Sequence, residues 1–384
     1  MFVNYLKFEN LRCHSISEYE FEENFNIIYG NNGIGKTTIL EAISICSMSK
    51  SFTNGTDQTI LKETENRYNI NLFAKNDNQL NYKVNVSYEL NKKKSISNSY
   101  VDNCSAKELI SQFPLVILNP DMKEITAGAP SNRRSFIDKI LSYTNISYYQ
   151  TLVDFKKVLK YRNSLLNSAL KDRYFDYALL EPWTDKFIEL SAKIIFNRIK
   201  FVYEFLDIYK EYYSEISSSK EVVDLNYKIH CDKTKNIINS VNNIYITNSK
   251  ENNLVLLENQ LKEIYEESKI IERRRGITTF GPHKDDLEIL LNDRLSKDKA
   301  SQGQHKTLLI SLKFAELDYI EKIRNEKPVV LLDDIFSELD EHRSAQLLSV
   351  LSKNKSQVLI TLTETNKISF IDKLGIKYKL FNLK

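Results

Sequence analysis

The chain has 384 residues, 42% of them hydrophobic and 27% charged, which indicates a globular protein with one large domain or two ordinary ones. Its formal net charge of +3 neither requires a nucleic-acid partner nor excludes one. With no signal-peptide pattern and no run of about eighteen apolar residues, we expect a cytoplasmic protein without a membrane span. Its four scattered cysteines form no C-x-x-C pair, which favours buried free thiols over a zinc site.

The first third of the chain is rich in patterns typical of β-strands. Short runs of aromatic and branched residues at 2–8 and 25–29 predict two strands. Residues 68–90 alternate apolar and polar side chains, which predicts an antiparallel hairpin with one apolar face. A further apolar run at 115–118 predicts another short strand.

Beyond about residue 130 the apolar spacing becomes that of helices. Apolar side chains three, four or seven apart between Trp183 and Ile208 predict one long helix, and 254–274 a second. The segments 217–220 and 236–253 favour loops around them.

From about residue 276 strands and helices alternate again. The short apolar runs at 329–332 and 358–360 are typical of strands covered on both faces. We therefore expect an α/β domain formed by residues 1–125 and 275–384, split by a helical insertion at 126–274.

A glycine-rich loop follows the strand predicted at 25–29. Its sequence GNNGIGKTT fits the phosphate-loop pattern G-x-x-x-x-G-K-[ST], in which backbone N–H groups and a helix N-terminus wrap a phosphate. We expect Lys36 to neutralise the β- and γ-phosphates of ATP and Thr37 to hold Mg²⁺. The nucleotide-binding residues expected here are Gly30, Asn31, Asn32, Gly33, Ile34, Gly35, Lys36, Thr37 and Thr38.

Two adjacent acids follow the apolar run at 329–332. A strand in this position delivers Asp333 and Asp334 to its carboxyl end, where ligands bind in open α/β sheets. We expect Asp333 to contact Mg²⁺ through water and Asp334 to orient or deprotonate the attacking water. A helix cap is the alternative reading of such a pair.

The stretch ASQGQHKTLL at 300–309 predicts the start of a helix. Ser301 and Gln304 have the spacing of a capping box, and leucines at helical spacing follow them. The same exposed N–H groups could also face a ligand outside the chain.

Together these motifs resemble the ATP-binding-cassette class of ATPases, specifically heads related to the structural-maintenance-of-chromosomes proteins. Five segments, in this order, resemble the RecF family of bacterial DNA replication and repair proteins. They are GNNGIGKTTILEAI at 30–43, GAPSNRRSFID at 128–138, GPHKDD at 281–286, ASQGQHK at 300–306 and LLDDIFSELD at 331–340. The resemblance implies an α/β fold, an SMC-like P-loop ATPase head with mixed sheets and a helical insertion domain.

The resemblance also implies a function. Members of the family are ATP-dependent DNA-binding proteins of recombinational repair that dimerise on ATP at gapped or junction DNA and assist RecA loading with RecO and RecR. By similarity, Ser301, Gly303 and Gln304 reach the γ-phosphate held by the second subunit, and Asp340 belongs to a loop that couples the two sites. Lys36 and Asp334 are then the catalytic residues of a slow ATPase.

Three departures from the wider cassette class concern the chemistry. Asp334 stands where many relatives have a catalytic glutamate, and Thr361 and Thr363 stand where many have a γ-phosphate-sensing histidine. The usual glutamine has no clear counterpart, since Gln112 comes too early. From these changes we expect slow hydrolysis, suited to a switch rather than a motor.

Other side chains leave two interpretations open. Arg133, Arg134 and the arginines at 273–275 could contact DNA phosphates or form salt bridges within the protein. The tyrosines at 143, 148 and 149 could stack on bases, although helix packing is the simpler interpretation. His283 has no metal partner at useful spacing, which favours a packing role.

Two other functions fit parts of the pattern. A cassette ATPase coupled to a nuclease, as in overcoming-lysogenisation-defect proteins, requires an additional acidic metal-binding domain. A nucleotide-binding subunit of a membrane transporter lacks the long helical insertion. The segment order favours the repair protein over both.

Overall fold

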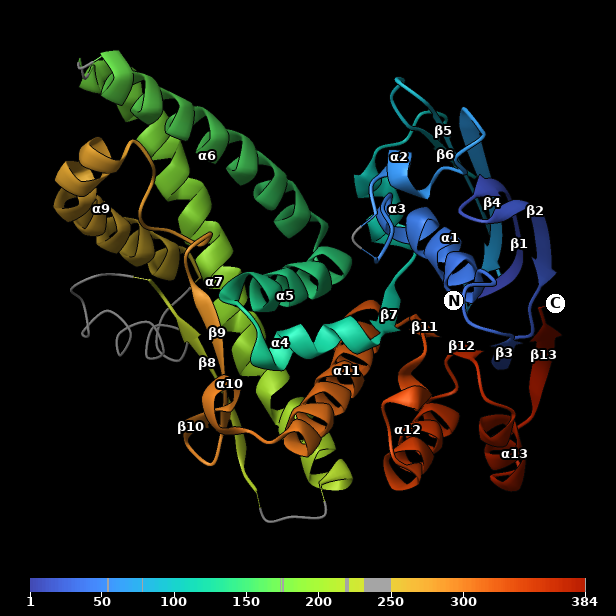
Figure 1. Ribbon diagram of the computed structural model, residues 1–384. Coiled ribbons are helices and arrows are strands. Elements are labelled where there is room, and N and C mark those ends of the chain that lie inside the picture. The colour runs from blue at the N-terminus through green and yellow to red at the C-terminus, as the bar shows by residue number, and fades with distance from the viewer. Residues whose placement is uncertain are drawn as a thin grey trace. The chain divides into compact units, whose positions relative to one another are not determined.

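A computed structural model describes residues 1–53, 55–77, 79–172, 174, 176–217, 221–230 and 250–383. The chain divides into two compact units, whose helices and strands are labelled in Figure 1. The first unit combines Met1–Lys123 with Lys306–Lys384, and the second is Glu124–His305. Residues 275–305, expected in the ATPase lobe, thus pack with the second unit. The lobe boundaries stay a prediction, because compact packing does not by itself define a functional lobe.

The first unit contains a five-stranded antiparallel sheet in the order β2-β1-β4-β5-β6. Its strands are β1 (Phe2–Leu11), β2 (His14–Glu20), β4 (Arg67–Lys75), β5 (Asn81–Glu89) and β6 (Ser95–Asn98). Alternate side chains are buried, with Ile70 opposite Val86 and Leu72 opposite Val84. This pairing confirms the predicted hairpin at 68–90.

A second sheet of the first unit is parallel, in the order β13-β3-β12-β11-β7. Its strands are β3 (Phe25–Tyr29), β7 (Leu115–Leu118), β11 (Val329–Leu332), β12 (Val358–Leu362) and β13 (Tyr378–Asn382). The sequence predicts strands at 25–29, 115–118, 329–332 and 358–360, the last two as strands covered on both faces, and the structure confirms these four as β3, β7, β11 and β12. Strand β13 was not predicted. Since the strands are parallel, their carboxyl ends meet at one edge, where a ligand site is expected.

Helices connect the strands of the first unit. They are α1 (Lys36–Met48), α2 (Asp57–Ile60), α3 (Ala106–Gln112), α12 (Glu341–Asn354) and α13 (Thr365–Lys373), with short 3₁₀ turns η1 (Pro120–Lys123) and η2 (Ile335–Ser337). Helix α11 (Gln302–Arg324) has its first turn in the second unit. α1 directly follows β3, as the phosphate-loop pattern predicts.

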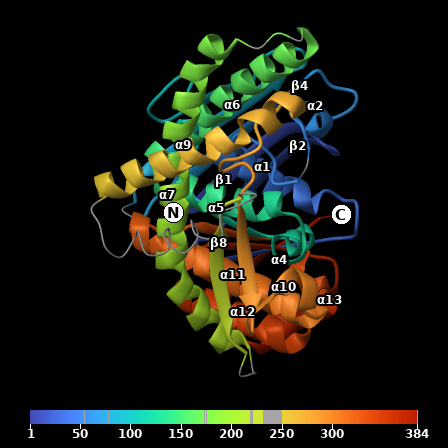
Figure 2. The ribbon, with the colours of Figure 1, turned by 90° about the vertical axis from the view of Figure 1, so that its left-hand side faces the viewer.

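The second unit is mainly helical. Its helices are α4 (Glu124–Ala127), α5 (Pro130–Thr144), α6 (Ile146–Asp172), α7 (Tyr177–Ile216), α9 (Lys250–Arg275) and α10 (Ser296–Lys299). α6, α7 and α9 lie side by side, as Figure 2 shows. A three-stranded antiparallel sheet has the order β10-β9-β8 and consists of β8 (Val223–Lys228), β9 (Asp286–Leu291) and β10 (Arg294–Leu295). It packs against α7 and α5. The two long predicted helices are confirmed by α7 and α9.

Two local expectations were wrong. Residues 250–253 are helical rather than a loop, because the buried face of α9 extends back to Asn253. Cys13 is exposed in the turn between β1 and β2, whereas Cys46 and Cys104 are buried free thiols. The loop segments 218–220 and 236–249, and Cys231, lie outside the described residues. In the ranges that the structure describes, no helix has both the length and the apolar character needed to cross a bilayer.

Candidate functional site

The phosphate loop joins β3 to α1 at the carboxyl edge of the parallel sheet. Gly33 and Gly35 have φ values of 82° and 97°, a backbone region that favours glycine. A Cβ atom on Gly35 would lie 2.1 Å from Nε2 of His14, so no larger residue fits without displacing that ring. The same Nε2 lies 3.1 Å from the carbonyl oxygen of Gly35. His14, which the sequence did not single out, therefore supports the loop from the start of β2.

Lys36 is the first residue of α1, and only 7% of its surface is exposed. Its ammonium group donates to the carbonyl oxygens of Gly30 and Asn31, both at 2.8 Å. Burial lowers the pKa of Lys36, whereas the nearby carboxylates of Asp334 and Asp333 act in the opposite direction. The lysine thus lies over its own loop, where a phosphate would give it an acceptor of opposite charge.

Asp333 follows β11 directly and is 8% exposed. The Thr37 hydroxyl lies 2.9 Å and 3.0 Å from its two carboxylate oxygens, and the Thr361 hydroxyl donates to Oδ1 at 2.8 Å. Burial raises the pKa of Asp333, although the bonds from Thr361 and Thr37 favour the ionised form. The predicted metal residues Thr37 and Asp333 are therefore in direct contact, despite lying 296 positions apart.

Asp334 has a left-handed backbone, with φ of 49°, immediately before η2. Its N–H group donates to the Thr361 hydroxyl at 2.9 Å. Thr361 of β12 thus contacts both acids: its hydroxyl donates to the Asp333 carboxylate and accepts from the Asp334 N–H group. This threonine, which the sequence left without a role, fixes the relative orientation of Asp333 and Asp334.

A cavity of about 420 Å³ opens over these residues, within the usual range for ligand sites. Its lining residues are Arg12, Cys13, Asn32, Gly33, Gly35, Lys36, Thr37, Thr38, Glu41, Thr53, Asp333, Asp334, Thr361 and Thr363. The oxygen atoms of Thr37 and Asp333 suit Mg²⁺, which takes few protein ligands and completes its shell with water and phosphate. Among the residues that the structure describes, no cluster of three His, Cys, Asp or Glu side chains could bind a metal alone.

One wall of this cavity is an ionic network that sequence reasoning missed. Arg12 donates to both carboxylate oxygens of Glu41, at 3.1 Å and 2.9 Å, and Glu41 also accepts from Ser51 and Thr53. Glu41 is 2% exposed. Burial tends to raise its pKa, but these hydrogen bonds hold the pKa of Glu41 below its ordinary value. The only sequence signal was an acid among the buried positions of α1.

Asn119 lies at the end of β7, on the strand that pairs with β11. It is 6% exposed, and its side-chain oxygen has no hydrogen-bond partner among the described residues. Gln112, which was considered for the missing glutamine, ends α3 instead. Asn119 was not singled out from the sequence, although it directly follows the apolar run at 115–118.

The signature residues Ser301, Gly303 and Gln304 lie at the start of α11 in the second unit. The Ser301 N–H group donates to Oε1 of Gln304 at 2.7 Å, and the Gln304 N–H group donates to the Ser301 hydroxyl at 3.3 Å. The predicted capping box is therefore confirmed. The Gln304 amide also donates to Glu221 at 2.6 Å, and Glu221 accepts a bond from Tyr213.

Asp340, in the first unit, caps α12. Its carboxylate accepts from the N–H group of Arg343 at 2.8 Å and forms an ion pair with the same side chain. The structure thus gives Asp340 a capping role, and its predicted nucleotide role stays a prediction.

The side chains considered for DNA contacts differ in exposure. Arg133 is 2% exposed and makes two 2.8 Å bonds to Asp286, so the salt-bridge interpretation holds for it. Arg134 is half-buried and donates to the backbone carbonyl of Asp285. The arginines at 273–275 are exposed at the end of α9, so a phosphate contact there stays open.

The tyrosines and His283 of the second unit have packing roles. Tyr143 and Tyr148 are buried, which removes them as base-stacking surfaces, and Tyr149 is half-buried. The His283 ring lies 6.0 Å from Phe155 and 6.2 Å from Phe187, between ring centroids. Burial lowers the pKa of His283 to about 4, so the ring is neutral at physiological pH.

Comparisons with known proteins agree with this geometry. The family model described as RecF/RecN/SMC N terminal domain matches residues 2–379. The DNA replication and repair protein RecF of Chloroherpeton thalassium is 36% identical over 94% of each chain. The protein of the same name from Prosthecochloris aestuarii is 32% identical over 99% of this chain and 98% of its own.

Solved structures extend the similarity to three dimensions. The recombination mediator protein RecF with ATPrS, of the RecFOR pathway, has a TM-score of 0.86 and 29% identity, over 100% of this chain and 96% of its own. The matches confirm the predicted fold class, an SMC-like ABC-type head that contains both parallel and antiparallel sheets.

Proposed function

Because this chain belongs to the RecF family of DNA replication and repair proteins, we propose that it is an ATP-controlled DNA-binding protein of recombinational repair. The observation that carries the proposal is the contact of Thr37 with Asp333 beside Lys36. A phosphate loop, a hydroxyl and a buried carboxylate meet at one cavity, which is the combination that a nucleotide and its metal require. The family is one of ATP-binding ABC-type ATPases.

Each residue of the loop has a distinct proposed part in binding ATP. The N–H groups of residues 31–36 wrap the phosphates, and Lys36 exchanges its carbonyl partners for phosphate oxygens. Thr37 and Asp333 hold Mg²⁺, which when bound neutralises phosphate charge. Gly30, Asn31, Asn32, Gly33, Ile34, Gly35 and Thr38 complete the loop.

Asp334 orients or deprotonates the attacking water in this proposal. Its carboxylate is one methylene shorter than that of a glutamate, and Thr361 fixes its backbone. We therefore expect hydrolysis slow enough for a switch, in which the bound nucleotide persists. A steady-state turnover of many ATP per second without DNA would contradict this expectation.

The proposed partners are DNA at gaps or junctions and a second copy of the chain. The solved relative is described as a recombination mediator of the RecFOR pathway, which supports RecO and RecR as partners here. Ser301, Gly303 and Gln304 of one copy contact the nucleotide held by the other, and Asp340 lies in the loop that couples the two sites. In this proposal the dimer on DNA, together with RecO and RecR, assists the loading of RecA.

Sizing the protein with ATP and Mg²⁺ tests the proposal. We expect the wild-type chain to shift from monomer to dimer, and Ser301→Arg to stay monomeric, because the larger cation blocks the start of α11. Ser369→Arg, at an exposed position of α13, serves as a control for an added arginine outside the signature. If both wild type and Ser301→Arg remain monomers that bind no DNA, the proposal fails.

A further inference from the structure

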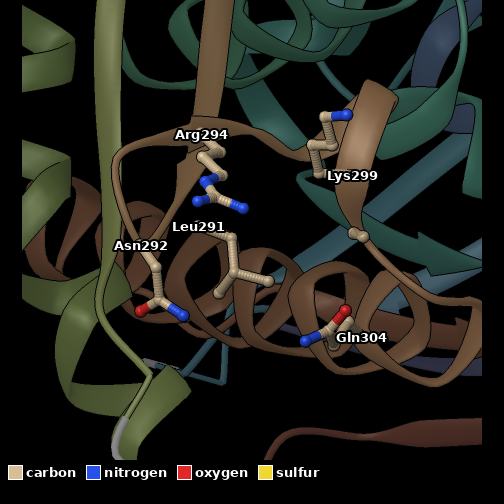
Figure 3. A pocket seen from close by; sticks show the side chains of 6 residues that line it. Leu291, Asn292, Arg294, Lys299 and Gln304 are labelled. Carbon is tan, nitrogen blue, oxygen red and sulfur yellow. The ribbon is translucent and has the colours of Figure 1, made fainter.

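A second cavity, of about 390 Å³, lies in the second unit beside the signature residues. Figure 3 shows Arg294 and Asn292 on one side of it and Lys299 and Gln304 on the other. Leu291 and Ala300 complete the lining. Its walls are the turn between β9 and β10 and the segment that leads into α11.

One short segment, residues 221–222, braces both walls of this signature cavity. Val222 and Asn292 are joined by two bonds: the Asn292 N–H group donates to the Val222 carbonyl at 2.8 Å, and the Val222 N–H group donates to Oδ1 of Asn292 at 2.9 Å. On the other side Glu221 accepts from the Gln304 amide at 2.6 Å. The cavity is thus held open by specific bonds before any ligand enters, which lowers the cost of binding one.

The charges of this cavity are not balanced. Arg294 and Lys299 are exposed, and the side chain of neither forms an ion pair or hydrogen bond with any residue that the structure describes. The acids on the same segment, Asp293 and Asp298, do not line the cavity. Glu221 is already engaged by Gln304 and Tyr213. Two cations therefore share one hollow next to the positive end of a long helix, an arrangement that an anion stabilises.

We propose that Arg294 and Lys299 bind phosphate groups of the nucleoside triphosphate that a second copy of the chain holds in its phosphate loop. This inference rests on the proposed function and extends it to two residues outside the signature. Gln304, expected to approach that nucleotide, lines the same cavity. The volume suits a few phosphate groups of a small ligand. Nucleic acid is the less favoured occupant, because sequence-independent binding requires a stripe of many phosphate contacts.

The test compares Arg294→Ala with Lys299→Ala and the double variant. Matched controls are Arg67→Ala, an exposed arginine of β4, and Lys297→Ala, two positions before Lys299 on α10. Sedimentation with Mg²⁺ and a non-hydrolysable ATP analogue measures dimerisation, and a fluorescent nucleotide measures the affinity of the monomer. We expect the double variant to dimerise at least about tenfold more weakly, because two charge-assisted contacts are lost. Monomer affinity and both controls should match wild type.

Three results overturn the inference. If the double variant dimerises with the same affinity as wild type, the inference is wrong, but the proposed function is unaffected. If the double variant binds nucleotide more weakly as a monomer, the two cations contact the nucleotide of their own chain. If the double variant loses only DNA binding, measured in the absence of nucleotide, the two cations contact nucleic acid. Failure of wild type itself to bind ATP rejects the proposed function first. Thermal unfolding and Arg294→Lys, which retains the charge, separate loss of binding from loss of fold.

Discussion

The phosphate-loop site and the signature cavity differ in how their charges are compensated. In the first, Lys36 donates to two carbonyl oxygens, and Asp333 accepts bonds from two threonines. In the second, Arg294 and Lys299 have no partner among the described residues. In the phosphate-loop site the charged side chains hydrogen-bond to other residues of the same chain, and we call it self-satisfied. In the signature cavity two positive charges have no neutralising partner among the described residues.

This difference predicts which properties of the protein should change when residues of each site are substituted. A substitution in a self-satisfied site leaves buried groups without partners, so it should alter nucleotide binding or hydrolysis and also local stability. A substitution of an exposed, unpartnered cation should alter association with a ligand and leave the fold unchanged. Variants that fail to follow this division would show that the comparison is wrong.

Lys36→Ala should have the largest effect. Loss of the ammonium group removes the charge that faces the phosphates, and we expect ATP affinity to fall by about a hundredfold or more while the protein stays folded. Isothermal titration calorimetry measures the affinity. Lys373→Ala, at the exposed end of α13, is the control. Undiminished affinity of Lys36→Ala would separate the loop from nucleotide binding.

Asp333→Asn should act on the metal rather than on the nucleotide alone. The amide oxygen can still accept the bonds of Thr37 and Thr361 but carries no charge. We expect the Mg²⁺-dependent part of ATP affinity to fall about tenfold to a hundredfold, with Mg²⁺-free binding retained. Titrations with and without Mg²⁺ measure both quantities. Asp334→Asn, the neighbouring substitution, should keep Mg²⁺-dependent binding and lose hydrolysis instead.

Local signals explain which parts could be predicted from the sequence. Gly33 and Gly35 need backbone angles that glycine tolerates, so the loop pattern carries its own geometry. The capping box spans only residues 301–304, and strands β7 and β11 of the parallel sheet are continuous apolar runs. Each of these signals lies within a few residues, where spacing alone determines the contact.

The supporting contacts could not be predicted, because they join residues far apart in the chain. Arg12 and Glu41 are separated by 29 positions, and Glu221 and Gln304 by 83. Nothing in the local pattern of Glu221 indicates that it holds the signature glutamine. The strand β8 is different, since Val223, Leu225 and Tyr227 alternate in the sequence and are buried in the structure. That signal was present and was not used.

Thr361→Val tests whether the self-satisfied site depends on its internal bonds. Valine has a similar shape but lacks the hydroxyl, so Asp333 loses a donor and the Asp334 N–H group loses its acceptor. We expect single-turnover hydrolysis to slow about tenfold, with ATP affinity within about threefold of wild type. Thr363→Val, on the same cavity wall, is the matched control. Equal effects of both substitutions would mean that the hydroxyl of Thr361 does not position the acids.

The smallest expected effect concerns the half-buried His283 and the buried Asp285 of the second unit, whose titrations oppose each other. Burial lowers the pKa of His283 to about 4, below its ordinary value, so its contribution to stability falls as pH drops from about 6.5 towards 4. Burial raises the pKa of Asp285 to about 6, above its ordinary value, so its contribution increases as pH drops through about 6. Each amounts to about 1–2 kcal/mol at pH 5, and they nearly cancel.

His283→Leu removes one of these opposing contributions. Between pH 7.5 and pH 5 the stability of the variant should therefore change more favourably than that of wild type by about 2 kcal/mol, the contribution that the histidine would have lost. Asp285→Asn should change in the opposite direction, because only the histidine contribution then remains. Denaturant unfolding at both pH values measures the difference. Parallel pH profiles for wild type and both variants would mean that neither group titrates as its burial requires.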